Sequence, residues 1–190
     1  MTTKFENGLF IFRRDFRIID NNGLNLLNER CKNIYTIFIF TPEQVSGANK
    51  YKSDNSVQFM IECLEDVDGQ IKKQGGKLHT FYGNNNSIIR ECIKILQIDY
   101  VVFNMDYTPY AIERDDAIVD LCEKMGVDVE MTHDYYLNPP GTILNGSGNA
   151  YQKFTPYYNV ASKMHIDSPS SARKIKFASF TGNLPNRISL

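Results

Sequence analysis

Five charged side chains follow a short apolar run near the start of the chain, and their position suggests a binding site. Leu9–Phe12 is long enough for one buried strand, and Leu24 begins a helical pattern. Charged groups between a buried strand and a helix lie in a βα loop, where open α/β sheets place their ligands. The alternative is that arginines and aspartates pair locally and only fix the loop. The residues concerned are Arg13, Arg14, Asp15, Arg17 and Asp20, followed by the turn Asn21-Asn22-Gly23.

A second polar loop follows the apolar segment Tyr100–Asn104. Its Asp106 can act as a polar anchor for a planar ligand. Phe40, Tyr107 and Tyr110 are aromatic side chains available for stacking on such a ligand, or for the core. The two loops together therefore predict binding of a ligand rather than hydrolysis.

Nucleotide and hydrolase motifs are missing. No G-x-x-x-x-G-K-[ST] occurs, and Gly146–Tyr151 lacks the third glycine of the dinucleotide pattern and follows the last predicted strand. The acidic groups of Glu113–Asp116 crowd a helix start, where the helix dipole accounts for them without catalysis. Among the histidines only His133, at a strand end, is a functional candidate, and a bond to loop backbone is the simpler interpretation. We therefore predict no catalytic residue.

The cysteines predict neither a metal site nor a disulfide framework, because no C-x-x-C spacing occurs among them. Cys63, Cys92 and Cys122 fall on apolar helix faces, so we expect buried thiols in a reducing compartment; the fourth cysteine is Cys31.

Five apolar segments rich in Ile, Val, Tyr and Phe alternate with helical patterns. This alternation predicts an α/β fold, a doubly wound, Rossmann-like sheet of five parallel strands with helices on both faces. With a strand order of roughly 3-2-1-4-5, the direction reverses between the first and fourth strands, and the two polar loops leave those strands. The predicted strands are Leu9–Phe12, Ile34–Phe40, Lys77–Tyr82, Tyr100–Asn104 and Asp128–Thr132.

The predicted helices have recognisable ends. The longest runs from about Asp54 to Gln74, where two glycines follow it. Ser87 is a candidate N-cap for the next helix. Thr108–Pro109 predicts another start, with Gly126 at its end. The first helix, Leu24–Arg30, is short.

Composition fits a single domain followed by a tail. The 190 residues are 42% hydrophobic and carry a net charge of −1, so no overall nucleic-acid footprint is present. No apolar run reaches the ~20 residues of a membrane span, and the N-terminus has no signal-peptide core, which predicts a soluble, intracellular protein. We divide the chain into an α/β domain, 1–135, and an irregular linker, 136–190, with one short helix near Thr155–Pro156.

Four collinear motifs resemble the DNA photolyase and cryptochrome family. Phe12–Asn21 is similar to its opening signature, and Asn104–Asp115 is similar to the loop and helix after its fourth strand. His133–Pro140 resembles the end of its α/β domain, and Gly148–Tyr157 contains a Tyr-x-x-Phe-Thr-Pro run typical of the segment that follows. In this resemblance Arg13, Arg14, Asp15, Arg17, Asp20, Asn21, Asn104, Arg114 and Asp115 are the motif residues that structure the loops.

The resemblance implies only part of the family's domain plan. Photolyases pair a light-harvesting α/β domain with a helical domain that binds FAD and receives the flipped pyrimidine dimer. The chain has no Trp, which the family's flavin domain uses for electron relay. We therefore expect a truncated or split photolyase, inactive alone as a lyase, that serves DNA repair with a helical FAD-binding domain in trans and contacts DNA only indirectly. The alternatives are a non-catalytic relic or a regulatory module with an empty pocket, and a generic nucleotide-binding domain.

The resemblance also implies an antenna chromophore. Folate-binding relatives have an Asn-Glu pair at the positions of Tyr110 and Ala111, which cannot make the same contacts. A deazaflavin or flavin is therefore expected rather than folate. Matching the family's antenna pocket onto this chain gives Phe40, Gln44, Val45, Asp106 and Thr108 as the cofactor-binding residues.

Overall fold

A mostly parallel sheet of six strands organises the chain. The computed structural model describes residues 4–190, so the N-terminal Met1–Thr3, part of the segment without a signal-peptide core, lies outside the description. The strand order is β5-β4-β1-β2-β3-β6. The strands are β1 (Phe5–Ile11), β2 (Cys31–Phe40), β3 (Leu78–Tyr82), β4 (Tyr100–Asn104), β5 (Asp128–Thr132) and β6 (Arg187–Ile188).

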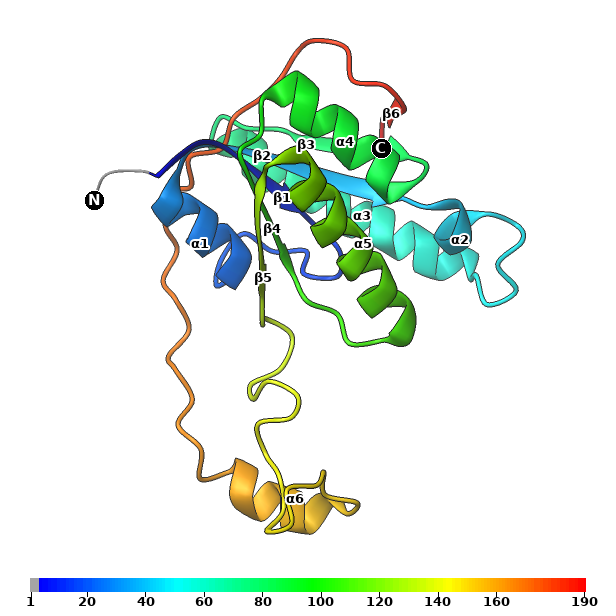
Figure 1. The fold of residues 1–190 in the computed structure, drawn as a ribbon. Helices are drawn as coiled ribbons and strands as arrows, with labels where there is room; N and C mark the ends of the chain where they lie inside the picture. The colour runs from blue at the N-terminus through cyan, green and yellow to red at the C-terminus, as the bar shows by residue number, and fades with distance from the viewer. Residues whose placement is uncertain (1–3) are drawn as a thin grey trace.

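The first five strands are parallel and stand in the predicted order, read from the opposite edge. Helices cover both faces, so the doubly wound prediction is confirmed (Figure 1). One core contains residues of α1 and α3, and the other contains residues of α4 and α5. The helices are α1 (Asn22–Arg30), α2 (Pro42–Val45), α3 (Asp54–Lys73), α4 (Asn85–Leu96), α5 (Pro109–Met125) and α6 (Phe154–Ala161).

Local sequence signals account for most helix ends. Thr108 Oγ1 accepts the Ala111 N–H at 3.3 Å with Pro109 in the first turn, and Gly126 ends α5 at φ +70°. The predicted cap of α4 is wrong: Asn84, three residues before Ser87, accepts the Ser87 N–H through its side chain. Ser87 cannot be the N-cap, because it lies within the helix, which begins at Asn85.

The C-terminal segment is more ordered than the sequence predicted. β6 pairs antiparallel with β3, and Phe177 forms a parallel bridge with Ile34 of β2, so the sheet has six strands rather than five. Ile175 and Leu184 are each only 2% exposed and belong to the two cores. The apolar residues of this segment are too widely spaced to give the periodic pattern of a helix or a strand, although they pack in the hydrophobic cores. The division of the chain at residues 135 and 136 stays a prediction.

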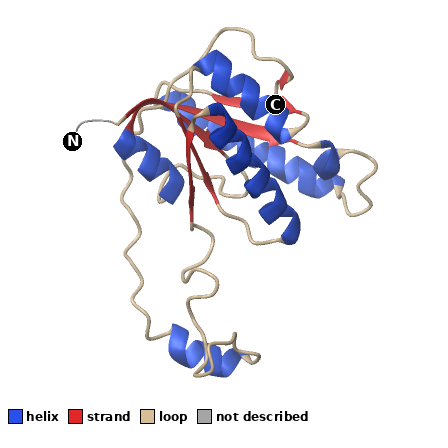
Figure 2. Cartoon of the chain, in the orientation of Figure 1, coloured by secondary structure: helices blue, strands red, loops and turns tan. Residues whose placement is uncertain are grey.

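Between β5 and this C-terminal segment the chain makes a long excursion away from the sheet, which we call the arm and define as residues 136–166. The arm is loop except for α6 at its far end (Figures 1 and 2). The predicted helix near Thr155 is thus present.

The cysteine prediction is partly wrong. Cys92 and Cys122 are buried, whereas Cys63 is only partly so, and Cys31, on no predicted helix face, is fully buried. All four are free thiols. Burial raises the pKa of the Cys31 and Cys92 thiols to about 12, so both are unreactive at neutral pH.

Candidate functional site

A cavity of about 380 Å³ opens at the carboxyl ends of the central strands. It is lined by residues from three βα loops: Arg13 after β1, Thr41 and Gln44 after β2, and Asp106 and Thr108 after β4. β1 and β4 are the neighbours at which the chain direction reverses. Ligands of open α/β sheets bind at such a crevice, so both polar loops meet where the sequence placed them.

Arg13 is the most unusual residue of the cavity wall. Only 8% of it is exposed, and its guanidinium lies 4.4 Å from the centroid of the Phe103 ring. Nη1 pairs with Asp115 Oδ1 at 2.5 Å. Within residues 4–190, no group accepts a hydrogen bond from Arg13 Nε or Nη2. Leaving buried donors without an acceptor is costly, and Arg13, which carries two of them, is one of the residues that line the cavity.

Asp115 holds a second guanidinium beside the first. Arg114, which also lines the cavity, donates from Nε to Asp115 Oδ1 at 2.9 Å. Burial raises the pKa of the Asp115 carboxyl to about 6, and the adjacent Arg114 guanidinium acts against that rise. With Arg13 paired at the same oxygen, we take Asp115 to be ionised at neutral pH. One carboxylate thus orients two arginines toward the cavity.

A buried polar cluster fixes the loop that carries Arg13. Asp15 Oδ1 accepts the Arg13 backbone N–H at 3.0 Å, and Oδ2 accepts Asn104 Nδ2 at 2.5 Å and Asn21 Nδ2 at 3.2 Å. Asn104 Oδ1 in turn accepts the Gly23 N–H at 3.2 Å and the Thr132 hydroxyl at 2.5 Å. Desolvation raises the pKa of Asp15 to about 6. The cluster joins the ends of β1, β4 and β5 to the start of α1.

Gly23 is required by close packing. A Cβ there would lie 2.6 Å from the Phe10 ring and 2.8 Å from Asn104 Oδ1. No side chain fits without displacing the cluster, so the first turn of α1 rests directly on Asn104.

The loop after β1, residues 13–21, which we call the motif loop, carries three further charges. Arg14 is largely exposed and lies 3.4 Å from Asp106 Oδ2 at the mouth. Arg17 pairs with Asp134 at 2.8 Å and donates to the Asp20 carbonyl at 2.6 Å. Asp20 adopts a left-handed φ of +54°, a conformation that Asp tolerates better than most residues. The ion pairs of the three arginines are thus with distant residues, Asp115, Asp106 and Asp134, rather than with Asp15 and Asp20 as the local-pairing alternative expected.

The predicted antenna residues are only partly brought together. Gln44, Asp106 and Thr108 line the cavity. Phe40 is buried in the core, with its ring 4.8 Å from that of Phe38, and Val45 packs against the same core, so neither lines the cavity. Residues two apart on a strand point to the same side of the sheet, so Phe38 and Phe40 share one face. Phe40 belongs to the core that also contains residues of α3. Whether the three remaining residues bind a chromophore stays a prediction.

Some cavity residues were not among the predicted cofactor contacts. Arg13 and Arg114 were predicted only as loop-structuring residues, and Tyr110 and Asn85 line the cavity as well. An arginine placed directly after a buried strand was a usable signal for Arg13. Asn85 had none, because its helix begins earlier than Ser87 suggested.

His133 makes a different contact from the predicted one. Its ring Nδ1 lies 2.6 Å from the Tyr107 hydroxyl, while its carbonyl accepts from Asn22 Nδ2 at 2.7 Å. The ring is therefore bound to a tyrosine rather than to loop backbone. Across residues 4–190, no group of three or more His, Cys, Asp or Glu side chains is arranged to hold a metal ion. None of the described helices is both long and apolar enough to cross a bilayer.

Comparison with known proteins identifies the family. A family model described as DNA photolyase matches residues 9–174. The chain belongs to the DNA photolyase family. Cryptochrome-1 of Aedes aegypti is 31% identical over 95% of this chain, which spans 34% of that protein. A deoxyribodipyrimidine photo-lyase from Synechococcus is 27% identical over 79% of this chain and 31% of its own length.

The fold agrees with this family membership. The structure of an archaeal photolyase from Sulfolobus tokodaii, described with two FAD molecules and a novel light-harvesting cofactor, superposes with a TM-score of 0.82. The two are 33% identical, and the match covers 92% of this photolyase-family chain and 38% of the archaeal one. The chain thus corresponds to the N-terminal α/β domain, about a third of these relatives' length.

Proposed function

We propose that this photolyase-family domain binds a flavin or deazaflavin as an antenna chromophore in the cavity lined by the ends of β1 and β2 and by the loop after β4. The observation that carries the proposal is a cavity of about 380 Å³ at the carboxyl ends of the central strands, with the buried Arg13 among the residues of its wall. That volume falls at the small end of ligand pockets. It suits a fused tricyclic ring and leaves the rest of a dinucleotide outside.

The chemistry of the lining supports this class of ligand. The dione edge of a flavin or deazaflavin carries carbonyl oxygens, which would accept hydrogen bonds from donor side chains of the lining, where Arg13, Arg14 and Arg114 are found. Asp106 and Gln44 supply polar groups at other edges of the cavity. The archaeal relative's second FAD gives FAD a place among the candidates. Tyr110, at the position of an Asn in folate-binding relatives, disfavours a pterin.

The bound chromophore would absorb light and pass its excitation to a flavin held by a helical partner domain. The partner flavin would perform light-driven repair of pyrimidine dimers, because electron transfer to the lesion belongs to the flavin site. In this proposal the α/β domain holds and orients the chromophore, excludes water from its ring, and has no chemical step of its own.

Titration of the purified chain with FMN, FAD, a 5-deazaflavin and a methenyl folate tests the proposal. We expect quenched chromophore fluorescence and an absorbance shift with the first three. Arg13→Lys retains the charge but loses the planar fork, and should weaken binding roughly 10- to 100-fold. Arg90→Lys, on the exposed side of α4, is the matched control and should bind as the native chain does.

Two outcomes would contradict this function. Binding of none of the four compounds would favour an empty pocket and a purely regulatory or relic domain. Equal affinities of the native chain and Arg13→Lys would place the chromophore elsewhere. Arg13→Lys also weakens a buried ion pair. The thermal unfolding midpoint of this variant is therefore measured first, and the titrations are run at a temperature well below it.

A further inference from the structure

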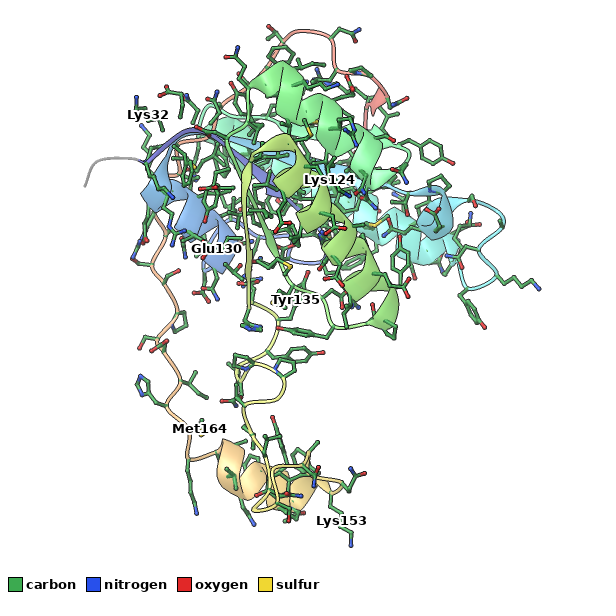
Figure 3. The ribbon with its side chains drawn as sticks, in the orientation of Figure 1. Lys32, Lys124, Glu130, Tyr135, Lys153 and Met164 are labelled. Atoms are coloured by element: carbon green, nitrogen blue, oxygen red, sulfur yellow. The ribbon has the colours of Figure 1, made fainter. Side chains whose placement is uncertain are left out.

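The last residues of the chain run along the β3 edge of the sheet, and we call residues 179–190 the strap. Just before the strap, the Ala178 N–H donates to the Ile34 carbonyl at 2.8 Å, which fixes its start on β2. Strand β6 of the strap then pairs antiparallel with β3. In Figure 3 the strap, drawn in red, lies at the opposite end of the molecule from Lys153 and Met164 of the arm. The strap and the arm are therefore separate elements.

The strap is held on β3 by a short ladder and one buried side chain. Strand β6 is only two residues long. The Tyr82 N–H donates to the Asn186 carbonyl at 3.1 Å. The Thr80 hydroxyl donates to the Ile188 carbonyl at 2.8 Å, and Leu184 is buried in the core beneath α4. A segment with so few bonds to an edge strand opens at a lower free energy than the centre of the sheet does.

His79 of β3 lies on the same face of the sheet as Leu184. It is the register partner of Ile37 and lies two residues before Phe81, and both of these belong to the core that contains Leu184. Residues two apart on a strand point to the same side of the sheet, so His79 shares this face. The ring is fully buried, and neither nitrogen has a hydrogen-bond partner within residues 4–190. A buried imidazole without partners is strongly disfavoured in its charged form.

Two cations add to the penalty on a protonated His79. Arg187 lies in β6 opposite Phe81, and Lys77 directly precedes β3. Burial of the ring is the largest cause that lowers the pKa of His79, to about 4, and these two charges act in the same direction. A ring that takes up a proton while the strap is in place is therefore both desolvated and close to like charge.

The one acid that acts in the opposite direction already has partners. It is Asp68 of α3. Its Oδ2 pairs with Lys72 Nζ at 2.6 Å, and its Oδ1 accepts the Leu78 N–H at 2.9 Å. Because both carboxylate oxygens are in use, Asp68 is poorly placed to become the counter-ion of a charged His79.

The other elements around the ring bring no charge to it within residues 4–190. The titratable side chains buried in this core are the thiols of Cys92 on α4 and Cys122 on α5, and burial raises their pKa values to about 12 and about 11. Tyr35 of β2 packs against the same core and adds a phenol, and Leu184 of the strap is apolar. A proton on His79 is therefore tolerated only where water reaches the ring.

We propose that the strap is a pH-sensitive element, which lies on β3 at neutral pH and detaches when His79 takes up a proton. With the strap lifted, water reaches the imidazole and Arg187 moves away from it. The strap also supplies part of the wall of a second cavity of about 610 Å³, whose other lining residues belong to α3, β3 and the turn between them. Release therefore opens this cavity and exposes the hydrogen-bonding edge of β3. The device is independent of the proposed chromophore, which binds at the other cavity.

The direction and size of the pH dependence follow from the two states of the ring. With the strap in place the pKa of His79 is about 4, and with the strap lifted it returns to the ordinary value near ~6.5. The open form binds more protons between these two values, so the open fraction rises as the pH falls and levels off below pH 4. Between pH 7 and pH 5 the equilibrium constant for opening should increase about 20-fold.

Hydrogen exchange of backbone amides, followed by NMR on the full 190-residue chain, tests the proposal. The Tyr82 N–H reports on the strap because its acceptor is the Asn186 carbonyl, and the amides of β4 report on the centre of the sheet. After correction for the intrinsic exchange rate, protection at Tyr82 should fall about 20-fold from pH 7 to pH 5. Low concentrations of urea should leave this exchange unchanged, because local opening exposes little surface.

Three variants separate His79 from other causes. His79→Leu removes the titrating ring, so protection at Tyr82 should no longer depend on pH. Arg187→Gln removes a like charge and raises the pKa of the buried ring, so the pH effect should become smaller than in the native chain. His165→Gln is the matched control, because the His165 side chain is 88% exposed, and it should behave as the native chain does.

Three results would overturn the proposal. The first is protection at Tyr82 that does not change with pH in the native chain, and the second is a native pH dependence in His79→Leu. The third is an equal loss of protection at Tyr82 and in β4 with equal sensitivity to urea, which would assign proton uptake to global unfolding. Because Arg187 is only partly buried, Arg187→Gln keeps the proposal testable if His79→Leu does not fold, and an undiminished pH effect in that variant would also refute it.

Discussion

Replacing Asn104 by Asp should change the stability of the domain in a strongly pH-dependent way. Asn104 is fully buried, and both ends of its amide are in use. Nδ2 donates to Asp15 Oδ2 and Asn21 Oδ1, while Oδ1 accepts from Gly23 N–H and the Thr132 hydroxyl. Asn104→Asp retains the accepting oxygen and turns the donor into a second carboxylate oxygen facing Asp15.

The size of the stability loss follows from the proton that the new carboxyl group and Asp15 would have to share. Two carboxylates at hydrogen-bond distance cannot both ionise in a buried site. Relative to an unfolded Asp with a pKa near 3.9, keeping one acid protonated costs about 4 kcal/mol at pH 7 and about 1.5 kcal/mol at pH 5, at ~1.36 kcal/mol per unit. Asn104→Ala loses the same bonds without adding charge. It should cost about 3–5 kcal/mol, with little change between these pH values.

Urea unfolding followed by circular dichroism at pH 7 and pH 5 measures the difference. Between pH 7 and pH 5 the variant should gain about 2.5 kcal/mol, and the native chain should gain about 1.3 kcal/mol because Asp15, with its pKa of about 6, also takes up a proton. The stability gap between the native chain and Asn104→Asp should therefore narrow by about 1.3 kcal/mol on acidification. The gap for Asn104→Ala should stay constant. Thr132→Val is the mild control, because it removes only one bond to Asn104, and should cost about 1 kcal/mol. An Asn104→Asp chain as stable at pH 7 as the native chain, or with a pH-independent deficit, would refute the cluster's role.

Two further predictions concern other buried residues. His79 is fully buried, with both ring nitrogens unpaired among the described residues, and burial lowers its pKa to about 4. The unfolded state therefore binds more protons than the folded state between pH 6.5 and 4, so His79 destabilises the fold as the pH falls. In urea unfolding, the free energy of unfolding of His79→Leu should rise by about 2 kcal/mol relative to that of the native chain between pH 7 and 5. A difference that stays constant with pH would contradict a buried, neutral His79. Leu184→Ala should lower stability by about 2–3 kcal/mol, because Leu184 belongs to the core beneath α4. Leu137→Ala is its control, because Leu137 is 76% exposed. Equal changes in the free energy of unfolding for the two variants would show that the C-terminal segment is not part of the core.

The sheet could be predicted because its signals are local. β4 and β5 begin and end at the residues predicted for them, Tyr100–Asn104 and Asp128–Thr132. A strand covered on both faces must be almost entirely apolar, as the fully buried β4 is, and α/β alternation then dictates parallel pairing. β6 lacked such a signal, since Arg187–Ile188 is too short to carry a period.

The site was predictable at the level of loops but not of side chains. Polar residues after β1 and β4 indicated the correct edge of the sheet. Separating Arg13, which faces the cavity, from Arg17, which pairs with Asp134, requires the direction of each side chain in an irregular loop. Similarly, the burial of Phe40 depends on strand register over α3, which its aromatic type alone does not determine.

The charges of the motif loop serve several parts of the structure. Arg13 and Arg14 face the cavity or its mouth, Asp15 and Asn21 form the buried cluster, and Arg17 and Asp20 hold the two ends of the arm. One loop thus connects the wall of the cavity, the buried cluster and both ends of the arm. A substitution that displaces the loop should therefore disturb all three parts of the structure together.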